Sequence, residues 1–245
     1  MNKPKMILFD YGHTLCNEAD FDGVRGMKAV LRHAVANKNN IGAEDLNAHF
    51  FNLYDGIAKD IRNAGAELHN LICEKFMYEY LQIAFDMPPV LIERIFWDNA
   101  APGVPMANAG LVLDYLKSHG IRSGVISNIS FCGANLANRI GELFPGHMFE
   151  FIIASSEYIY RKPHVMLFEL ALRKADLPAE DVWFCGDSTK HDLDGARSAG
   201  IFPVWYHSHI ECGYRDKSTD VRPEYEHLYI RDWLELIKIL DGLPL

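Results

Sequence analysis

Short runs rich in apolar residues recur along this chain of 245 residues. They cover residues 6–9, 123–127, 149–154, 182–185, 202–206 and 227–230. Runs of this length with little polar alternation are typical of strands that are buried on both faces. Between the later runs, apolar residues follow a helical spacing at residues 107–119, 133–143, 165–175 and 193–199. Alternation of strand and helix predicts an α/β fold with a doubly wound parallel sheet.

Residues 16–99 follow a different pattern, without a strand signal. Apolar residues recur there every three or four positions, which predicts helices at residues 21–35, 44–61, 67–85 and 90–96. We therefore expect an all-helical cap domain at residues 16–99, inserted after the first strand. The core domain would consist of residues 1–15 and 100–245, and the APGVP sequence that ends at Pro105 would form a hinge.

Composition narrows the possible partners. The net charge is -9 and the sequence pI is about 5.6, so we expect no general attraction to nucleic acid or to an anionic membrane, and a small-molecule partner is favoured. The five cysteines are scattered without a CxxC pair, which is typical of reduced thiols. No apolar run approaches the roughly 18 residues of a membrane span. We therefore expect a cytoplasmic protein.

Four chemically active residues follow predicted strands. Asp10, Ser127 and Asp187 come at the ends of the first, second and fourth runs, and Lys162 lies in the segment after the third. Each alone is common as a cap, a turn or a surface residue. Ligands of open α/β sheets bind outside the carboxyl ends of the strands, so the combination indicates one shared site.

The segment VWFCGDSTKHDLDGARSAG carries the most specific signal. It places Asp187 directly after a strand and Asp192 five residues later. Two carboxylates so close together repel each other unless a cation or hydrogen-bond donors offset them. Oxygen ligands of this kind suit Mg²⁺, which commonly takes one or two carboxylates together with substrate phosphate.

Four short motifs carry a family resemblance. They are FDYGHT at residues 9–14, VISN at 125–128, RKP at 161–163 and GDSTKHD at 186–192. Their order and spacing resemble those of the haloacid dehalogenase superfamily of phosphatases and related enzymes, and the resemblance covers essentially the whole chain. It implies a Rossmann-like core with a helical cap between the first and second motifs.

The resemblance also implies roles for individual residues. Asp10 would be the nucleophile that forms an aspartyl-phosphate, which divides a difficult hydrolysis into two easier steps. Ser127 and Asn128 would bind the phosphoryl group of the substrate. Lys162 would neutralise the charge of that group and of Asp10. The implied reaction is hydrolysis of a small phosphorylated metabolite, such as a sugar phosphate, a nucleotide or a small organic phosphate.

A magnesium site is part of the same resemblance. Family members hold Mg²⁺ through the nucleophile, a backbone carbonyl two residues later and an acid of the fourth motif. In this chain these groups are Asp10, the carbonyl of Gly12 and Asp187. Asp192 and Ser188 would support the site without contacting the metal.

Gly12 departs from the family pattern, because phosphatases of this family carry an aspartate there that protonates the leaving group. Loss of general acid/base catalysis typically costs about 10²- to 10⁴-fold in rate, or roughly 3 to 5 kcal/mol. Three interpretations remain open. The protein is a phosphatase in which water or His13 substitutes, a metal-independent haloacid dehalogenase, or a protein that binds a phosphorylated ligand with little turnover. For His13 itself we favour a loop role.

One further cluster, formed by His207, His209 and Cys212, follows the fifth strand. A zinc site needs more ligands than this segment supplies. We therefore expect a loop there.

Overall fold

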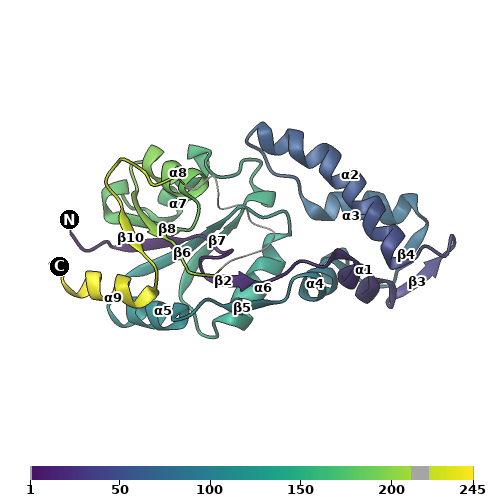
Figure 1. Ribbon diagram of the computed structural model, residues 1–245, viewed down its shortest axis with the longest axis horizontal. Coiled ribbons are helices and arrows are strands. Elements are labelled where there is room, and N and C mark those ends of the chain that lie inside the picture. The colour runs from purple at the N-terminus through teal and green to yellow at the C-terminus, as the bar shows by residue number, and fades with distance from the viewer. Residues whose placement is uncertain (1, 211–220, 245) are drawn as a thin grey trace.

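A parallel sheet with helices on both faces forms the left-hand part of the computed structural model, which describes residues 2–210 and 221–244 (Figure 1). Its strands are β1 (Met6–Phe9), β6 (Arg122–Ser127), β7 (Phe149–Ala154), β8 (Val182–Gly186), β9 (Phe202–Tyr206) and β10 (Leu228–Ile230). Their order in the sheet is β10-β9-β8-β1-β6-β7, and every neighbouring pair is parallel. All six predicted strands are therefore confirmed.

Two hydrophobic clusters fasten the helices to the sheet. Helices α5 (Ala109–Ser118), α6 (Gly133–Leu143) and α9 (Trp233–Asp241) cover one face. Helices α7 (Val165–Ala175) and α8 (Asp194–Ser198) cover the other. Side chains of β1 alternate between them: Ile7 and Phe9 enter the first cluster, and Met6 and Leu8 the second. Burial on both faces explains why β1 is apolar throughout, and it confirms the doubly wound fold.

The inserted segment has a hydrophobic cluster of its own. Its helices are α1 (Gly23–Leu31), α2 (Ala43–Asn63), α3 (Asn70–Tyr80) and α4 (Pro89–Ala100), and they lie at the right of Figure 1, away from both termini. Met27, Phe50, Met77 and Phe96 bring one apolar side chain from each helix into this cluster. Phe50, Tyr78 and Phe96 thus serve helix packing, whereas Phe76 and Tyr80 are exposed. The domain boundaries at residues 15 and 99 stay a prediction.

The prediction that the insert is all-helical is wrong. Strand β3 (Ala34–Asn37) pairs antiparallel with β4 (Ile83–Phe85), and β2 (Cys16–Glu18) pairs antiparallel with β5 (Gly103–Pro105). The expected helices at 21–35 and 67–85 end earlier, α3 just before Gln82, whose φ is 57°. These strands are three or four residues long, and their partners are distant in sequence. They are too short for an alternation of apolar and polar residues to predict them.

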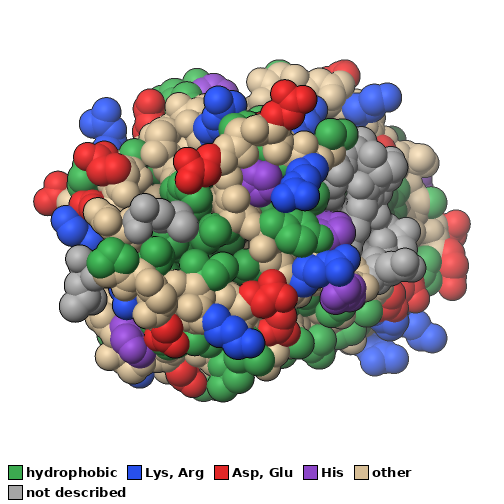
Figure 2. Space-filling view, turned by 60° about the vertical axis from the view of Figure 1, so that its left-hand side comes forward, with side chains coloured by type: hydrophobic (Ala, Val, Ile, Leu, Met, Phe, Trp, Pro, Cys, Tyr) green, Lys and Arg blue, Asp and Glu red, His purple; other side chains and the backbone are tan. Residues whose placement is uncertain are grey.

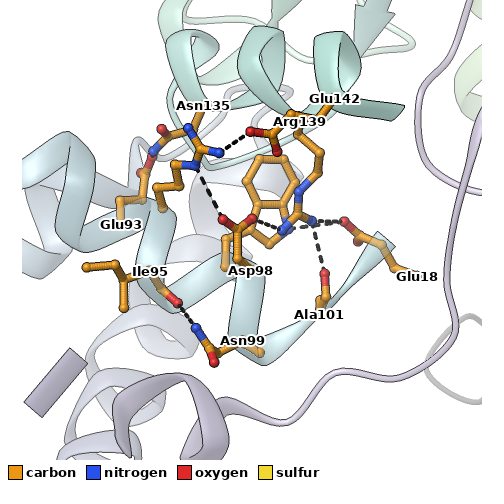
Figure 3. A network of polar contacts seen from close by, with 12 residues as sticks. Glu18, Glu93, Ile95, Asp98, Asn99, Ala101, Asn135, Arg139 and Glu142 are labelled. Atoms are coloured by element: carbon orange, nitrogen blue, oxygen red, sulfur yellow. Dashed lines mark hydrogen bonds and ion pairs between the residues drawn. The ribbon is translucent and has the colours of Figure 1, made fainter. Parts of the chain in front are cut away.

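Arg139 of α6 joins the insert to the core (Figure 3). Its Nη1 donates to Glu18 Oε1 of β2 at 2.7 Å and to the carbonyl of Ala101 at 3.0 Å. Its Nη2 donates to Asp98 Oδ1 at 2.7 Å, and its guanidinium lies 3.8 Å from the ring centre of Trp97. One buried side chain therefore binds both segments that connect the insert to the sheet.

A second junction lies in the loop between α2 and α3. The amide of Glu67 donates to the carbonyl of Ile159 at 2.9 Å, and the amide of Arg161 donates to the carbonyl of Gly65 at 3.0 Å. This loop thus rests directly on the core segment that precedes Lys162.

One face of the molecule has acidic and basic side chains interspersed, with hydrophobic ones between them (Figure 2). The described part of this face has no extended basic surface of the kind that binds nucleic-acid phosphates. No helix within residues 2–210 and 221–244 is long and apolar enough to cross a membrane.

Candidate active site

Three of the predicted site residues meet at the carboxyl edge of the sheet. Asp10 follows β1, Ser127 ends β6 and Asp187 follows β8, and these three strands are neighbours in the sheet. Parallel strands present their carboxyl ends at one edge, so residues more than a hundred positions apart converge. All three line a cavity of about 480 Å³.

Lys162 brings the third motif into this cavity. Its Nζ donates to Asp10 Oδ1 and to Asp192 Oδ1, each at 2.6 Å, and the side chain is 1 % exposed. Burial lowers the pKa of Lys162, but the attraction of the two carboxylates outweighs burial and raises it. The ammonium group therefore stays protonated between the two acids.

Asp192 reaches the lysine because Gly186 leaves room for it. A Cβ at Gly186 would lie 2.4 Å from the Cβ of Asp192, so a larger residue would displace the acid. Asp192 Oδ2 also accepts a hydrogen bond from the amide of Ser188 at 2.9 Å. Burial raises the pKa of Asp192 to about 6, although Lys162 opposes the shift.

The carboxylates of this cavity form a cluster that can hold a metal. One oxygen each of Asp10, Asp187 and Asp192 lies within 4.8 Å of the others, and all three residues are buried. Lys162 bonds to two of them and so offsets only part of their charge. Gly12, whose carbonyl is a further oxygen donor, lines the same cavity. A surplus of buried negative charge with oxygen donors fits a hard divalent cation.

Ser127 and Asn128 differ in what they contact. Ser127 is buried at the end of β6 and lines the cavity. Asn128 Nδ2 donates to the carbonyl of Lys162 at 2.8 Å, and the amide of Lys162 donates to Asn128 Oδ1 at 2.7 Å. These bonds make Asn128 a positioning residue for the lysine. The phosphoryl contacts of both residues stay predictions.

Gly12 and His13 lie in the cavity wall. A Cβ added to Gly12 would meet no atom within 4 Å, so a side chain can begin there without a clash. The glycine is therefore not required by packing. His13 adopts a φ of 58°, in the left-handed region that few non-glycine residues occupy. Its presence in the wall keeps it a candidate for proton transfer.

Several residues that line the cavity were missed by sequence reasoning. Arg161 and His191 precede Lys162 and Asp192 in the chain, and Glu18 and Trp97 come from the junction of insert and core. Membership of a motif was the available signal for Arg161 and His191, but it does not show where a side chain points. Burial lowers the pKa of His191 to about 4, helped by the charge of Arg161, so this imidazole is neutral at pH 7.

The histidines after β9 do not join the site. His207 Nδ1 lies 3.1 Å from the hydroxyl of Tyr229, and neither His207 nor His209 lines the cavity. Cys212, the third member of the predicted cluster, lies outside the described residues.

The chain is similar to several known proteins. It is 26 % identical over 246 residues to a glyceraldehyde 3-phosphate phosphatase of Methanocaldococcus jannaschii, with 98 % of each chain covered. Among solved structures it resembles a phosphatase of Thermococcus onnurineus, with a TM-score of 0.61, 18 % identity and 98 % and 99 % of the two chains covered. It also resembles a 2-haloacid dehalogenase of Pseudomonas syringae pv. Tomato, with a TM-score of 0.62, 18 % identity and 97 % and 98 % covered.

The match to a family agrees with the motifs and the sheet. Residues 67–205, more than half of the chain, match the haloacid dehalogenase-like hydrolases. These residues include the second, third and fourth motifs. The first motif starts at the end of β1, which lies between β6 and β8 in the sheet. The chain therefore belongs to the haloacid dehalogenase-like hydrolases, a family of enzymes.

Proposed function

We propose that this enzyme is a Mg²⁺-dependent phosphatase of small phosphomonoesters that uses Asp10 as its nucleophile. One observation carries the proposal: the Nζ of Lys162 lies 2.6 Å from both Asp10 and Asp192, beside Asp187. A carboxylate nucleophile, a fixed cation and a set of metal ligands thus share one cavity. Phosphoryl transfer depends chiefly on such alignment and positive charge.

The reaction would proceed in two steps at Asp10. A carboxylate oxygen attacks phosphorus, the bond to the leaving alcohol breaks, and an aspartyl-phosphate forms. Water then attacks this phosphorus, which releases inorganic phosphate and restores the carboxylate. Lys162 holds Asp10 through Oδ1 and places positive charge beside the incoming phosphoryl group. Ser127 would donate its hydroxyl hydrogen to one of the phosphoryl oxygens.

Asp10, Asp187 and the carbonyl of Gly12 would hold Mg²⁺, with Asp192 kept on Lys162. When bound, the ion would supply positive charge to the phosphoryl oxygens in both steps. The close approach of three buried carboxylates supports this assignment.

Proton supply to the leaving group is the unusual part of this site. Gly12 has no side chain to protonate the departing oxygen, so the proton would come from water or from His13 in the cavity wall. Substrates whose leaving groups depart without a proton should therefore react best. A halide is such a leaving group, which keeps haloacid dehalogenation as the second candidate reaction.

The substrate would be a small metabolite. The cavity of about 480 Å³ lies at the low end of the range for ligand pockets. The relative from Methanocaldococcus jannaschii is described as acting on glyceraldehyde 3-phosphate, which has three carbons and one phosphate. A phosphorylated compound of three to six carbons is the size that we propose.

The test is phosphate release from a panel of phosphorylated metabolites, with and without Mg²⁺. We expect release that requires the metal and that disappears in Asp10→Asn. Absence of metal-dependent release on every substrate would overturn the proposal. Halide release from 2-haloacids without metal, measured in parallel, would then identify the enzyme as a dehalogenase.

A further inference from the structure

A second cavity, of about 540 Å³, adjoins the active site. Arg161, Lys162 and His191 line both cavities, so the two lie side by side. The remaining wall comes from the end of α2 and the following loop, from Pro163 and His164, and from Lys190. No carboxylate is among the described residues that line it, although the whole chain has a net charge of -9.

The arginines of this second cavity are only partly neutralised. Arg62 Nε and Arg161 Nη1 lie 3.2 and 3.4 Å from the two oxygens of a single carboxylate, Glu67. That carboxylate is buried and lies outside the cavity lining. Two guanidinium groups therefore share one negative charge. Nη1 of Arg161 is also buried without a hydrogen-bond acceptor of good geometry among the described residues.

Lys190 adds a third positive charge. Its side chain is exposed, and it makes no ion pair with any residue in the described ranges 2–210 and 221–244. The positive potential of the cavity is therefore not cancelled locally. Concave surfaces lined by one sign of charge concentrate ions of the opposite sign.

The backbone holds this cavity beside the reacting group. Ala66 and Tyr160 form an isolated antiparallel bridge, and the amide of Arg161 donates to the carbonyl of Gly65 at 3.0 Å. Arg161 is thus anchored through its backbone to the insert and through its sequence neighbour, Lys162, to Asp10. A substrate with its phosphoryl group at Asp10 meets Arg161 as the next cation.

We propose that the second cavity is an anion subsite that binds a carboxylate or second phosphate at the far end of the substrate. This inference rests on the proposed phosphatase function and specifies its substrate class: phosphomonoesters that carry a second anionic group. Arg161 and Arg62 would bind that group, and Lys190 would attract it from the exposed rim.

Two substrate pairs test the subsite. 3-Phosphoglycerate and glycerol 3-phosphate differ only in a terminal carboxylate, and fructose 1,6-bisphosphate and fructose 6-phosphate differ in a second phosphate. Calorimetric binding to Asp10→Asn removes turnover from the measurement. We expect the member with the second anionic group to bind about tenfold more tightly or better in at least one pair, as one charge-assisted hydrogen bond provides. Equal binding within both pairs would overturn the subsite.

Reversing the charge of Lys190 tests whether the preference for a second anionic group arises in the second cavity. Lys190→Glu should remove most of the preference, whereas Lys174→Glu, at an exposed lysine of α7 outside the cavity, should leave it unchanged. Equal loss in both variants would mean a general charge effect and would overturn the location. Fold is checked in each variant by thermal unfolding.

Turnover separates the two proposals. Metal-dependent phosphate release with equal kcat/KM within both pairs would support the phosphatase and overturn the subsite. Preferential binding of the members with a second anionic group, without release of phosphate by the wild-type enzyme, would support the subsite and overturn the phosphatase.

Discussion

Buried acids occur in two regions of this molecule with opposite charge balance. At the sheet edge, Asp10, Asp187 and Asp192 lie close together, and Lys162 binds Asp10 and Asp192. At the junction of insert and core, one buried acid, Glu18, accepts hydrogen bonds from the guanidinium of Arg139 and from the indole N–H of Trp97. The Glu18 carboxylate is thus held by two hydrogen-bond donors, which suits a permanent contact. At the sheet edge two buried acids share one lysine beside a third buried acid, which suits a place where cation and substrate bind.

The first and largest expected effect is at the sheet edge. Asp10→Asn should lower kcat by about 10⁴-fold or more, because loss of a nucleophile removes the covalent step. Phosphate release under saturating substrate measures it. Asp181→Asn, at a surface acid paired with Lys5, is the matched control and should keep wild-type activity. Comparable activity in Asp10→Asn and the control would contradict the nucleophile assignment.

Restoring an acid at position 12 should have the next largest effect. The space beside Gly12 is open, so Gly12→Asp should fold and should raise kcat on alkyl phosphates by about 10²-fold or more. Aryl phosphates, whose leaving groups need no proton, should gain much less. Gly12→Asn has the same size without the acid. If it accelerates alkyl phosphates as strongly as Gly12→Asp, proton transfer is not what limits the rate.

Substitutions at the junction of insert and core should lower the stability of the protein. Arg139→Leu leaves Glu18 buried without its ion-pair partner, and breaking such a pair costs about 3 to 5 kcal/mol in the free energy of unfolding. Urea unfolding measures it. Arg122→Leu breaks the half-exposed pair with Glu150 and should cost no more than about 1 kcal/mol.

The double variant Arg139→Leu with Glu18→Leu completes this comparison. It should recover a large part of the lost stability, because no charge is then left buried alone. A loss in the double variant as great as the sum of the two single losses would mean that packing on Trp97, rather than charge balance, dominates the junction.

The smallest expected effect is metal-linked stability. At a free Mg²⁺ concentration about 100 times its Kd, the free energy of unfolding should rise by about 2.7 kcal/mol. Asp187→Asn should abolish this increase, and Glu18→Gln should retain it, since Glu18 lies at the junction of insert and core. Equal stabilisation of both variants by Mg²⁺ would place the metal elsewhere.

The sheet was predictable because its signals are local. A strand covered on both faces must be apolar at consecutive positions, as at residues 6–9, and it ends where polar residues begin. The residue after such a strand falls at the carboxyl edge whatever the rest of the chain does. Asp10, Ser127 and Asp187 could therefore be assigned to one site without knowledge of the loops.

Short strands and buried ion pairs were not predictable in this way. β3 and β4 are too short to alternate visibly, and each is held by a partner more than forty residues away. Arg139 and Glu18 are 121 positions apart, and in the sequence each looks like an ordinary surface charge. Asn128 likewise ends the second motif, but its hydrogen bonds to the backbone of Lys162 depend on how two loops meet.

The sequence by itself determined the parallel sheet, the family and the residues at the strand ends, because buried periodicity and motif spacing are properties of neighbouring positions. The tertiary structure decided which charges are paired: Lys162 with two acids, Arg139 with Glu18, and Arg62 and Arg161 with Glu67. The physical reason is that the strength of a charge pair depends on distance and burial. The distance between two charges and their burial are set only when segments far apart in the chain have packed together.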